Sequence, residues 1–237
     1  MRYLMSFSYD GSKFHGFQRQ NDVVSVQRTL EEALSRLLEE KVVIKGSGRT
    51  DAGVHALVQT AHFDTEQKLT KDFKDVLNNE LSNIVIEKIK KVDDDFHARF
   101  SVKEKTYRYV INLDRENQDD NYYFTSFVPL DVDKMKRTSK LLVGPHDFHN
   151  FVSGNREDYY TEIYKVDIKV DKNHIIFEFT GAGFYRYMIR HLVGALYDVG
   201  RGKATVDDVK FMLDFPDVFK QLSVLPAGGL YLVKVKY

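Results

Sequence analysis

The chain has 237 residues, with 35 basic and 35 acidic side chains and no cysteine. The lack of cysteine excludes disulfides, thiolate metal sites and cysteine nucleophiles. It also fits a reducing compartment, so we expect a cytoplasmic protein. No apolar run is long enough to span a membrane, and the N-terminus lacks the apolar stretch of a signal peptide. Nucleic-acid-binding proteins usually carry a basic excess, so with zero net charge any basic surface must come from local clustering.

The first half of the chain alternates between strand and helix patterns. Residues 2–9 alternate in the way that is typical of a strand. Ser25 is a suitable N-cap for a helix that carries apolar residues on one side. The remaining predicted elements are strands at 42–45 and 56–64, a short helix at 70–81 and a strand at 84–92. The element order is therefore β-α-β-β-α-β.

The second half repeats this order of elements without repeating the sequence. Gly200 ends one predicted helix, and Thr205 with Asp208 has the spacing of a capping box at the start of an additional helix. The other predicted elements are a strand at 106–113, a helix at 131–143, strands at 164–170 and 174–180, a helix at 184–199 and a strand at 230–236.

These patterns predict an α+β fold with two ferredoxin-like (β-α-β-β-α-β) halves, residues 1–103 and residues 104–237. Two such sheets would form a shared surface. Because domain interfaces commonly hold active sites, we expect the active-site cleft between the halves. The fold alone does not decide the function, since this topology serves many functions.

The glycine-rich stretch 46–56 is the densest local signal in the chain. Its three glycines within eight residues allow positive φ angles and close backbone approach. Arg49 and Asp51 would project to the same side of an extended backbone. From the residues alone, a plain hairpin turn capped by Asp51 is the simpler interpretation, although the stretch is longer than a hairpin loop needs.

Residues 48–56, GRTDAGVHA, resemble the catalytic motif of the tRNA pseudouridine synthase A family (TruA, tRNA pseudouridine synthase I). The resemblance covers nearly the whole chain and keeps the family's order of motifs. Residues 150–163 depart from the family pattern, and Phe17 stands where the family usually has tryptophan. The further matching segments are 9–20, 25–27, 95–101, 105–109, 144–148, 183–184, 188–190, 193–194, 199–203 and 229–233.

The resemblance implies an isomerase (an intramolecular transferase) that converts uridine to pseudouridine at positions 38, 39 and/or 40 of the tRNA anticodon stem-loop. The reaction breaks the C1′–N1 glycosidic bond, rotates the uracil and rejoins it through C5, and it requires no redox step, metal or cofactor. Asp51 would be the nucleophile, attacking either the ribose at C1′ or the uracil ring. The resemblance also implies a homodimer with tRNA as its partner.

Arg190 and Tyr107 complete the catalytic group by the same resemblance. Burial raises the pKa of a lone carboxylate, so Asp51 needs a nearby cation, and the family match assigns Arg190 to it. Tyr107 would stack on the flipped uracil, with a further role in removing the C5 proton left open. From the residues alone, the apolar neighbours of Arg190 favour a buried, paired side chain, whereas Tyr107 is typical of a strand's core face.

A second group of residues is expected to hold the substrate. Arg49 would hold the extruded nucleotide, Leu230 would close the other side of the pocket, and His55 would order the loop. The full expected substrate-binding set is Tyr107, Arg49, Leu230, His55, Arg19, Gln18 and Arg108.

Three other interpretations are weaker. A non-catalytic RNA-binding protein would not need Asp51, Tyr107 and Arg190 together. A carboxylate-dependent hydrolase would need a second carboxylate, and no spacing recommends Asp10 or Asp95. A metal site built on the histidines lacks cysteine or an acidic cluster beside them, so we expect no metal.

Overall fold

The computed structural model describes residues 1–216, 218 and 221–237, and these form two units. The first unit comprises Met1–Lys103 together with Tyr231–Tyr237, and the second comprises Glu104–Leu230. The predicted division at residue 103 differs from this for the last seven residues. They group with the first unit because Tyr231 and Leu232 pair with the strand that begins at His55.

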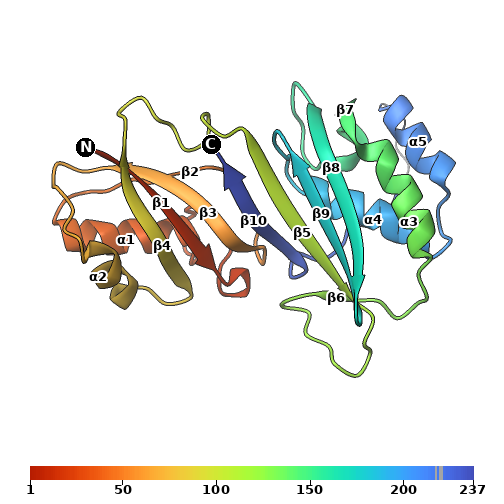
Figure 1. The fold of residues 1–237 in the computed structure, drawn as a ribbon, viewed down its shortest axis with the longest axis horizontal. Helices are drawn as coiled ribbons and strands as arrows, with labels where there is room; N and C mark the ends of the chain where they lie inside the picture. Colours follow the sequence, from red (N-terminus) through yellow and green to blue (C-terminus); the bar gives the residue numbers. More distant parts are fainter. Residues whose placement is uncertain (217, 219–220) are drawn as a thin grey trace. The chain divides into compact units, whose positions relative to one another are not determined.

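The first unit is built on an antiparallel sheet with the strand order β4–β1–β3 (Figure 1). The short β2 pairs antiparallel with the other edge of β3, and β10 pairs parallel with the same edge. This is the ferredoxin-like strand order. Its elements are β1 (Arg2–Tyr9), a 3-10 turn (Gly11–Lys13), α1 (Val26–Leu38), β2 (Lys45–Gly46), β3 (His55–Asp64), α2 (Phe73–Glu80) and β4 (Ile84–Val92), followed at the chain's end by β10 (Leu230–Lys236).

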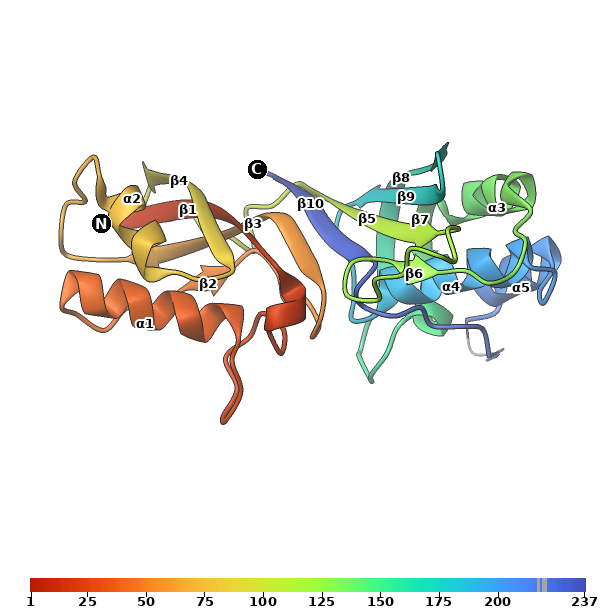
Figure 2. The same ribbon diagram turned by 90° about the horizontal axis from the view of Figure 1, so that it is seen from below.

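The core of the first unit lies between this sheet and α1, which runs along one face of the sheet (Figure 2). Ser25 caps α1 by accepting the N–H of Arg28, which confirms the predicted start of this helix. Alternation along β1 turns Met5 and Phe7 to the inside, and both are fully buried with Leu30 of α1.

The second unit has an antiparallel sheet with the strand order β5–β9–β8–β7, and the short β6 pairs parallel with β5. Helix α4 packs beneath this sheet and against α3 (Figure 2). The elements are β5 (Glu104–Asn112), β6 (Phe124–Thr125), α3 (Val132–Ser139), β7 (Gly144–Asp147), β8 (Tyr160–Asp171), β9 (His174–Gly181), α4 (Met188–Gly200) and α5 (Val206–Asp214), with two 3-10 turns at Lys140–Leu142 and His149–Phe151. The capping box of Thr205 and Asp208 at α5 is confirmed.

The predicted α+β class is confirmed, but several element boundaries were wrong. The strand expected at 42–45 is reduced to Lys45–Gly46, because preceding backbone N–H groups bond to side chains of α1 instead of a strand. The N–H of Val42 donates to Ser35, and that of Ile44 donates to Glu31. The helix expected from residue 184 begins at Met188. The sequence patterns also missed β6 and β7, whose two and four residues are too short to show a period.

Candidate active site

The loop of residues 47–54 joins β2 to β3 and carries Asp51. A buried glutamine anchors its first part. The Ser47 hydroxyl donates a 2.6 Å hydrogen bond to the Gln59 side-chain oxygen, and the Gln59 amide donates to the Gly48 carbonyl oxygen at 3.2 Å. Gln59 belongs to β3, so the loop is tied to the sheet that it leaves and rejoins.

Thr50, the residue before Asp51, is held from two sides. Its hydroxyl lies 2.8 Å from that of Tyr9, and burial raises the pKa of Tyr9 to about 12, so this phenol stays neutral near pH 7. Its carbonyl oxygen accepts the N–H of Phe17 at 3.1 Å. Gly16 has a φ of +89°, and a Cβ there would lie 3.0 Å from the Thr50 carbonyl oxygen, so this close approach requires glycine. Asp51 is partly exposed on a backbone fixed by these contacts.

His55 follows the loop as the first residue of β3, and it is only 3% exposed. Its Nδ1 accepts the backbone N–H of Gly11 at 3.0 Å, so this nitrogen carries a lone pair although Asp10 lies 3.3 Å away. Its ring stacks on Tyr231 with the centroids 4.7 Å apart. These contacts suit the ordering of the loop, and a buried ring is poorly placed to contact RNA directly.

Gln18, Arg19 and Arg49 are the exposed members of the expected substrate-binding set in the first unit. Arg19 extends from the segment that packs on the loop, and its guanidinium lies 3.2 Å from the carboxylate of Glu31. Arg49 is on the loop itself, two residues before Asp51. The first unit therefore presents two exposed arginines, one on the loop and one on the segment that packs against it. Contact with phosphates would require such exposed cations.

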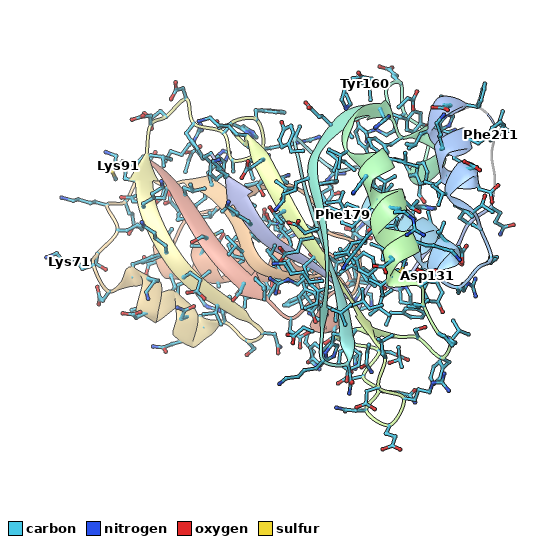
Figure 3. All side chains as sticks on the ribbon, turned by 45° about the vertical axis from the view of Figure 1, so that its right-hand side comes forward. Lys71, Lys91, Asp131, Tyr160, Phe179 and Phe211 are labelled. Carbon is cyan, nitrogen blue, oxygen red and sulfur yellow. The ribbon has the colours of Figure 1, made fainter. Side chains whose placement is uncertain are left out.

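Tyr107 and Arg108 are neighbours on β5, so their side chains point to opposite faces of the sheet. Tyr107 is 9% exposed, lies opposite Phe179 of β9 (labelled in Figure 3), and meets Phe184 edge to face at 5.4 Å. Arg108 pairs with Glu178 at 2.7 Å on the other face, where Lys169 also lines a shallow hollow. The structure therefore separates these two expected substrate residues.

Arg190 lies in the first turn of α4 and is half-buried. Its Nε donates a 2.6 Å hydrogen bond to the carbonyl oxygen of Leu225. Its guanidinium carbon lies 4.3 Å from the ring centroid of Tyr187, within cation–π range. Burial raises the pKa of Tyr109 on β5, and the charge of Arg190 opposes that shift. The sequence did not predict Leu225 or Tyr187 as partners, although Tyr187 is only three residues before Arg190.

The predicted site residues divide between the two units. The pairing of Asp51 with Arg190 therefore stays a prediction from the sequence. Leu230 is buried at the start of β10. Asp51, Arg49, His55, Arg19 and Gln18 belong to the first unit, and Tyr107, Arg108, Arg190 and Leu230 belong to the second.

Among the described residues, no group of three or more His, Asp or Glu side chains is arranged to hold a metal ion. His146 and His149 are three residues apart, a spacing that metal ligands can have, but they have separate partners: His146 faces the carbonyl of Val143, and His149 stacks on Tyr159. No helix in the described part of the chain is long and apolar enough to cross a membrane.

Known proteins resemble this chain over its whole length. The family model described as tRNA pseudouridine synthase matches residues 5–101 and 138–237. The tRNA pseudouridine synthase A of Lactobacillus helveticus is 41% identical over 246 residues, which cover 100% of this chain and 94% of the relative. The chain belongs to the tRNA pseudouridine synthase family. Two further relatives carry the same name, tRNA pseudouridine synthase A. The one from Mycoplasmoides gallisepticum is 38% identical and covers 99% of this chain and 90% of the relative. The one from Brevibacillus brevis is 40% identical and covers 97% of each.

Membership of the tRNA pseudouridine synthase family makes the chain an isomerase, and it confirms the resemblance seen in the sequence motifs. The matched ranges include Asp51 and Arg190. Tyr107 and Arg108 lie in the stretch between the two ranges. The family assignment therefore does not depend on them.

Proposed function

We propose that this isomerase converts uridine to pseudouridine at positions 38, 39 and/or 40 of the tRNA anticodon stem-loop, acting in the cytoplasm as a homodimer. The observation that supports this is the loop at Asp51: Thr50 before it is buried and hydrogen-bonded to Tyr9, the N–H of Gly53 after it donates to the Phe14 carbonyl oxygen, and Asp51 itself is partly exposed. A nucleophile needs this combination of a fixed backbone and a side chain that substrate can reach.

The proposed chemistry uses no cofactor. The Asp51 carboxylate attacks either C1′ of the ribose or the uracil ring, the C1′–N1 bond breaks, and the uracil turns and rejoins through C5. The bond between Asp51 and the substrate breaks again before the product leaves. The C5 proton is lost and N1 gains a proton, so pseudouridine has the same atomic composition as uridine. No electron acceptor is needed, because one glycosidic bond replaces another.

Arg190 and Tyr107 have supporting roles in this proposal. Arg190 supplies positive charge that keeps the catalytic carboxylate ionised, and its guanidinium is already oriented by Leu225 and Tyr187. Tyr107 supplies an aromatic surface for the flipped uracil, and Phe184 holds its ring from the edge. Arg49 and Arg19 bind phosphates, and Leu230 is a wall of the pocket.

Tritium release from tRNA labelled at uridine C5 tests the function directly, because the label leaves only when the base is rejoined through C5. The wild-type protein should release tritium, and Asp51→Asn should release none while still binding tRNA. Asp22→Asn is a matched control, because Asp22 is an exposed carboxylate of the same unit that the proposal does not use. Full activity in Asp51→Asn would exclude the nucleophile, and no release by the wild-type protein would exclude the function.

A further inference from the structure

Asp198 is a fully buried carboxylate on α4, at 0% exposure, among apolar helix neighbours. Both of its oxygens are bonded. They accept the backbone N–H and the hydroxyl of Ser223, each at 2.8 Å, and they lie 2.7 Å from Arg201 and 3.5 Å from Lys203. Burial alone would raise the pKa of Asp198, but the bonds from Ser223 and Arg201 outweigh it and lower the pKa, so the group is ionised. A buried ionised acid is uncommon unless it is paired and hydrogen-bonded, as Asp198 is with Arg201 and Ser223.

Asp198 binds the start of the segment of residues 223–229, whose first residues, Ser223 to Leu225, lie along α4. Gly194, one turn before Asp198, allows the contact, because a Cβ there would overlap the Ser223 carbonyl oxygen. Further along, the hydroxyl of Tyr109 donates a 2.8 Å hydrogen bond to the Pro226 carbonyl oxygen. The segment is thus fixed at its start by Asp198 and near its middle by Tyr109.

Between these two anchors the segment contacts Arg190. The Leu225 carbonyl oxygen accepts the Arg190 Nε–H at 2.6 Å, and the Leu225 N–H donates back to the Arg190 carbonyl oxygen at 3.3 Å. On another side, the Tyr187 ring lies against the guanidinium at 4.3 Å. Tyr187 has a φ of +61°, a left-handed conformation that a tyrosine rarely adopts. Arg190 is therefore held by its hydrogen bond to Leu225 of the segment and by the ring of Tyr187, whose backbone is strained.

We propose that Asp198 is a positioning residue for Arg190, acting through Ser223 and the Leu225 carbonyl. This inference rests on the proposed role of Arg190 in the isomerisation. Without the hydrogen bonds from Ser223 to the Asp198 carboxylate, Leu225 shifts, and the guanidinium of Arg190 that is bonded to it shifts as well. Because displacement of a catalytic group by about 1 Å can cost on the order of a hundredfold in rate, the effect appears in kcat.

The competing explanation is that Asp198 serves RNA binding by ordering Arg201 and Lys203, which are both exposed. That role would raise KM instead of lowering kcat. Arg201→Gln is the matched control: it removes the Asp198–Arg201 ion pair and the longer 3.2 Å bond from Arg201 to the Ser223 hydroxyl, and it leaves both bonds between Asp198 and Ser223 in place.

The test is steady-state and single-turnover kinetics of Asp198→Asn, Ser223→Ala and Arg201→Gln, with Asp198→Asn repeated in an Arg190→Lys background. We expect kcat to fall about tenfold to a hundredfold in Asp198→Asn, less in Ser223→Ala, and little in Arg201→Gln, with KM nearly constant. In the Arg190→Lys background, Asp198→Asn should cost little more. Equal losses in both backgrounds, or an effect on KM alone, would overturn the proposal.

A second measurement does not depend on the reaction. The Arg190 Nε–H should give a proton signal protected from solvent exchange in wild-type protein, and Asp198→Asn or Ser223→Ala should remove most of that protection. If Asp198→Asn does not fold, Ser223→Ala carries both measurements. Unchanged protection in a folded variant would exclude the coupling. Inactivity of the wild-type protein would instead exclude the proposed function, so the two failures are distinguishable.

Discussion

The backbone N–H of Gly11 donates a 3.0 Å hydrogen bond to Nδ1 of His55, although 44 residues separate them in the chain. A Cβ at Gly11 would overlap the Val54 carbonyl, so the two segments meet at backbone distance. This contact and the one between Gly16 and Thr50 press residues 11–17 against the loop that carries Asp51. The geometry at Asp51 therefore depends on a distant part of the chain, which can be altered without touching the loop.

Gly16→Ala should lower activity by moving the loop. The new Cβ would lie 3.0 Å from the Thr50 carbonyl oxygen and 3.2 Å from the Ala52 nitrogen, so the backbone on both sides of Asp51 must shift. We expect at least a tenfold fall in kcat, together with a loss of about 1–3 kcal/mol in the free energy of unfolding. Tritium release and urea denaturation measure these two effects.

Gly154→Ala is the control for Gly16→Ala. Gly154 has nearly the same backbone angle, a φ of +91°, but a Cβ there would have no atom within 4 Å. It should cost only the strain of the left-handed conformation, about 1 kcal/mol, and leave kcat unchanged. Equal kcat losses in both variants would show that the contact with Thr50 is not the cause.

Stability should fall with pH below about 6.5 because of His62. Burial lowers the pKa of His62 to about 4, with further lowering by the charge of Arg2 and by His97. The folded state therefore prefers the neutral ring of His62. This preference contributes its full stabilisation at pH values above the pKa that His62 has in the unfolded chain. As pH falls from about 6.5 to about 4, up to ~3 kcal/mol is lost.

Urea denaturation at several pH values, comparing wild-type protein with His62→Asn, isolates this contribution. Asparagine keeps an acceptor for the Ala98 N–H, which His62 Nδ1 accepts at 3.0 Å, but it does not titrate. The pKa of His97 is also lowered, mainly by burial, so the variant should keep a weaker dependence of the same sign. Identical pH profiles for the two proteins would contradict the assignment to His62.

Chelation should leave the initial rate of isomerisation unchanged. The proposed reaction exchanges one glycosidic bond for another, so no metal has a step to perform. The assay compares tritium release with and without a chelator, on tRNA kept folded by monovalent salt and a polyamine. A rate that falls on chelation and returns with zinc or magnesium, while the tRNA stays folded, would require a metal in the mechanism.

Local interactions account for what could be predicted from the sequence. Ser25 and the pair Thr205 and Asp208 cap their helices through bonds that span three residues, so spacing alone identifies them. Strands of eight or more residues show their alternation, and motifs in a constant order identify the family. The strand expected at 42–45 failed because Ile44 bonds to Glu31, which is remote in sequence.

The roles of individual side chains around Asp51 and Arg190 were decided only by tertiary structure. The sequence by itself identified the family and predicted Asp51 and its loop as the site. It could not show that His55 is buried against Gly11, that Arg108 faces away from Tyr107, or that Leu225 holds Arg190 from 35 residues away. The physical reason is that hydrogen bonds and close packing depend on distance in space, and residue spacing reports that distance only within a helix turn or a strand.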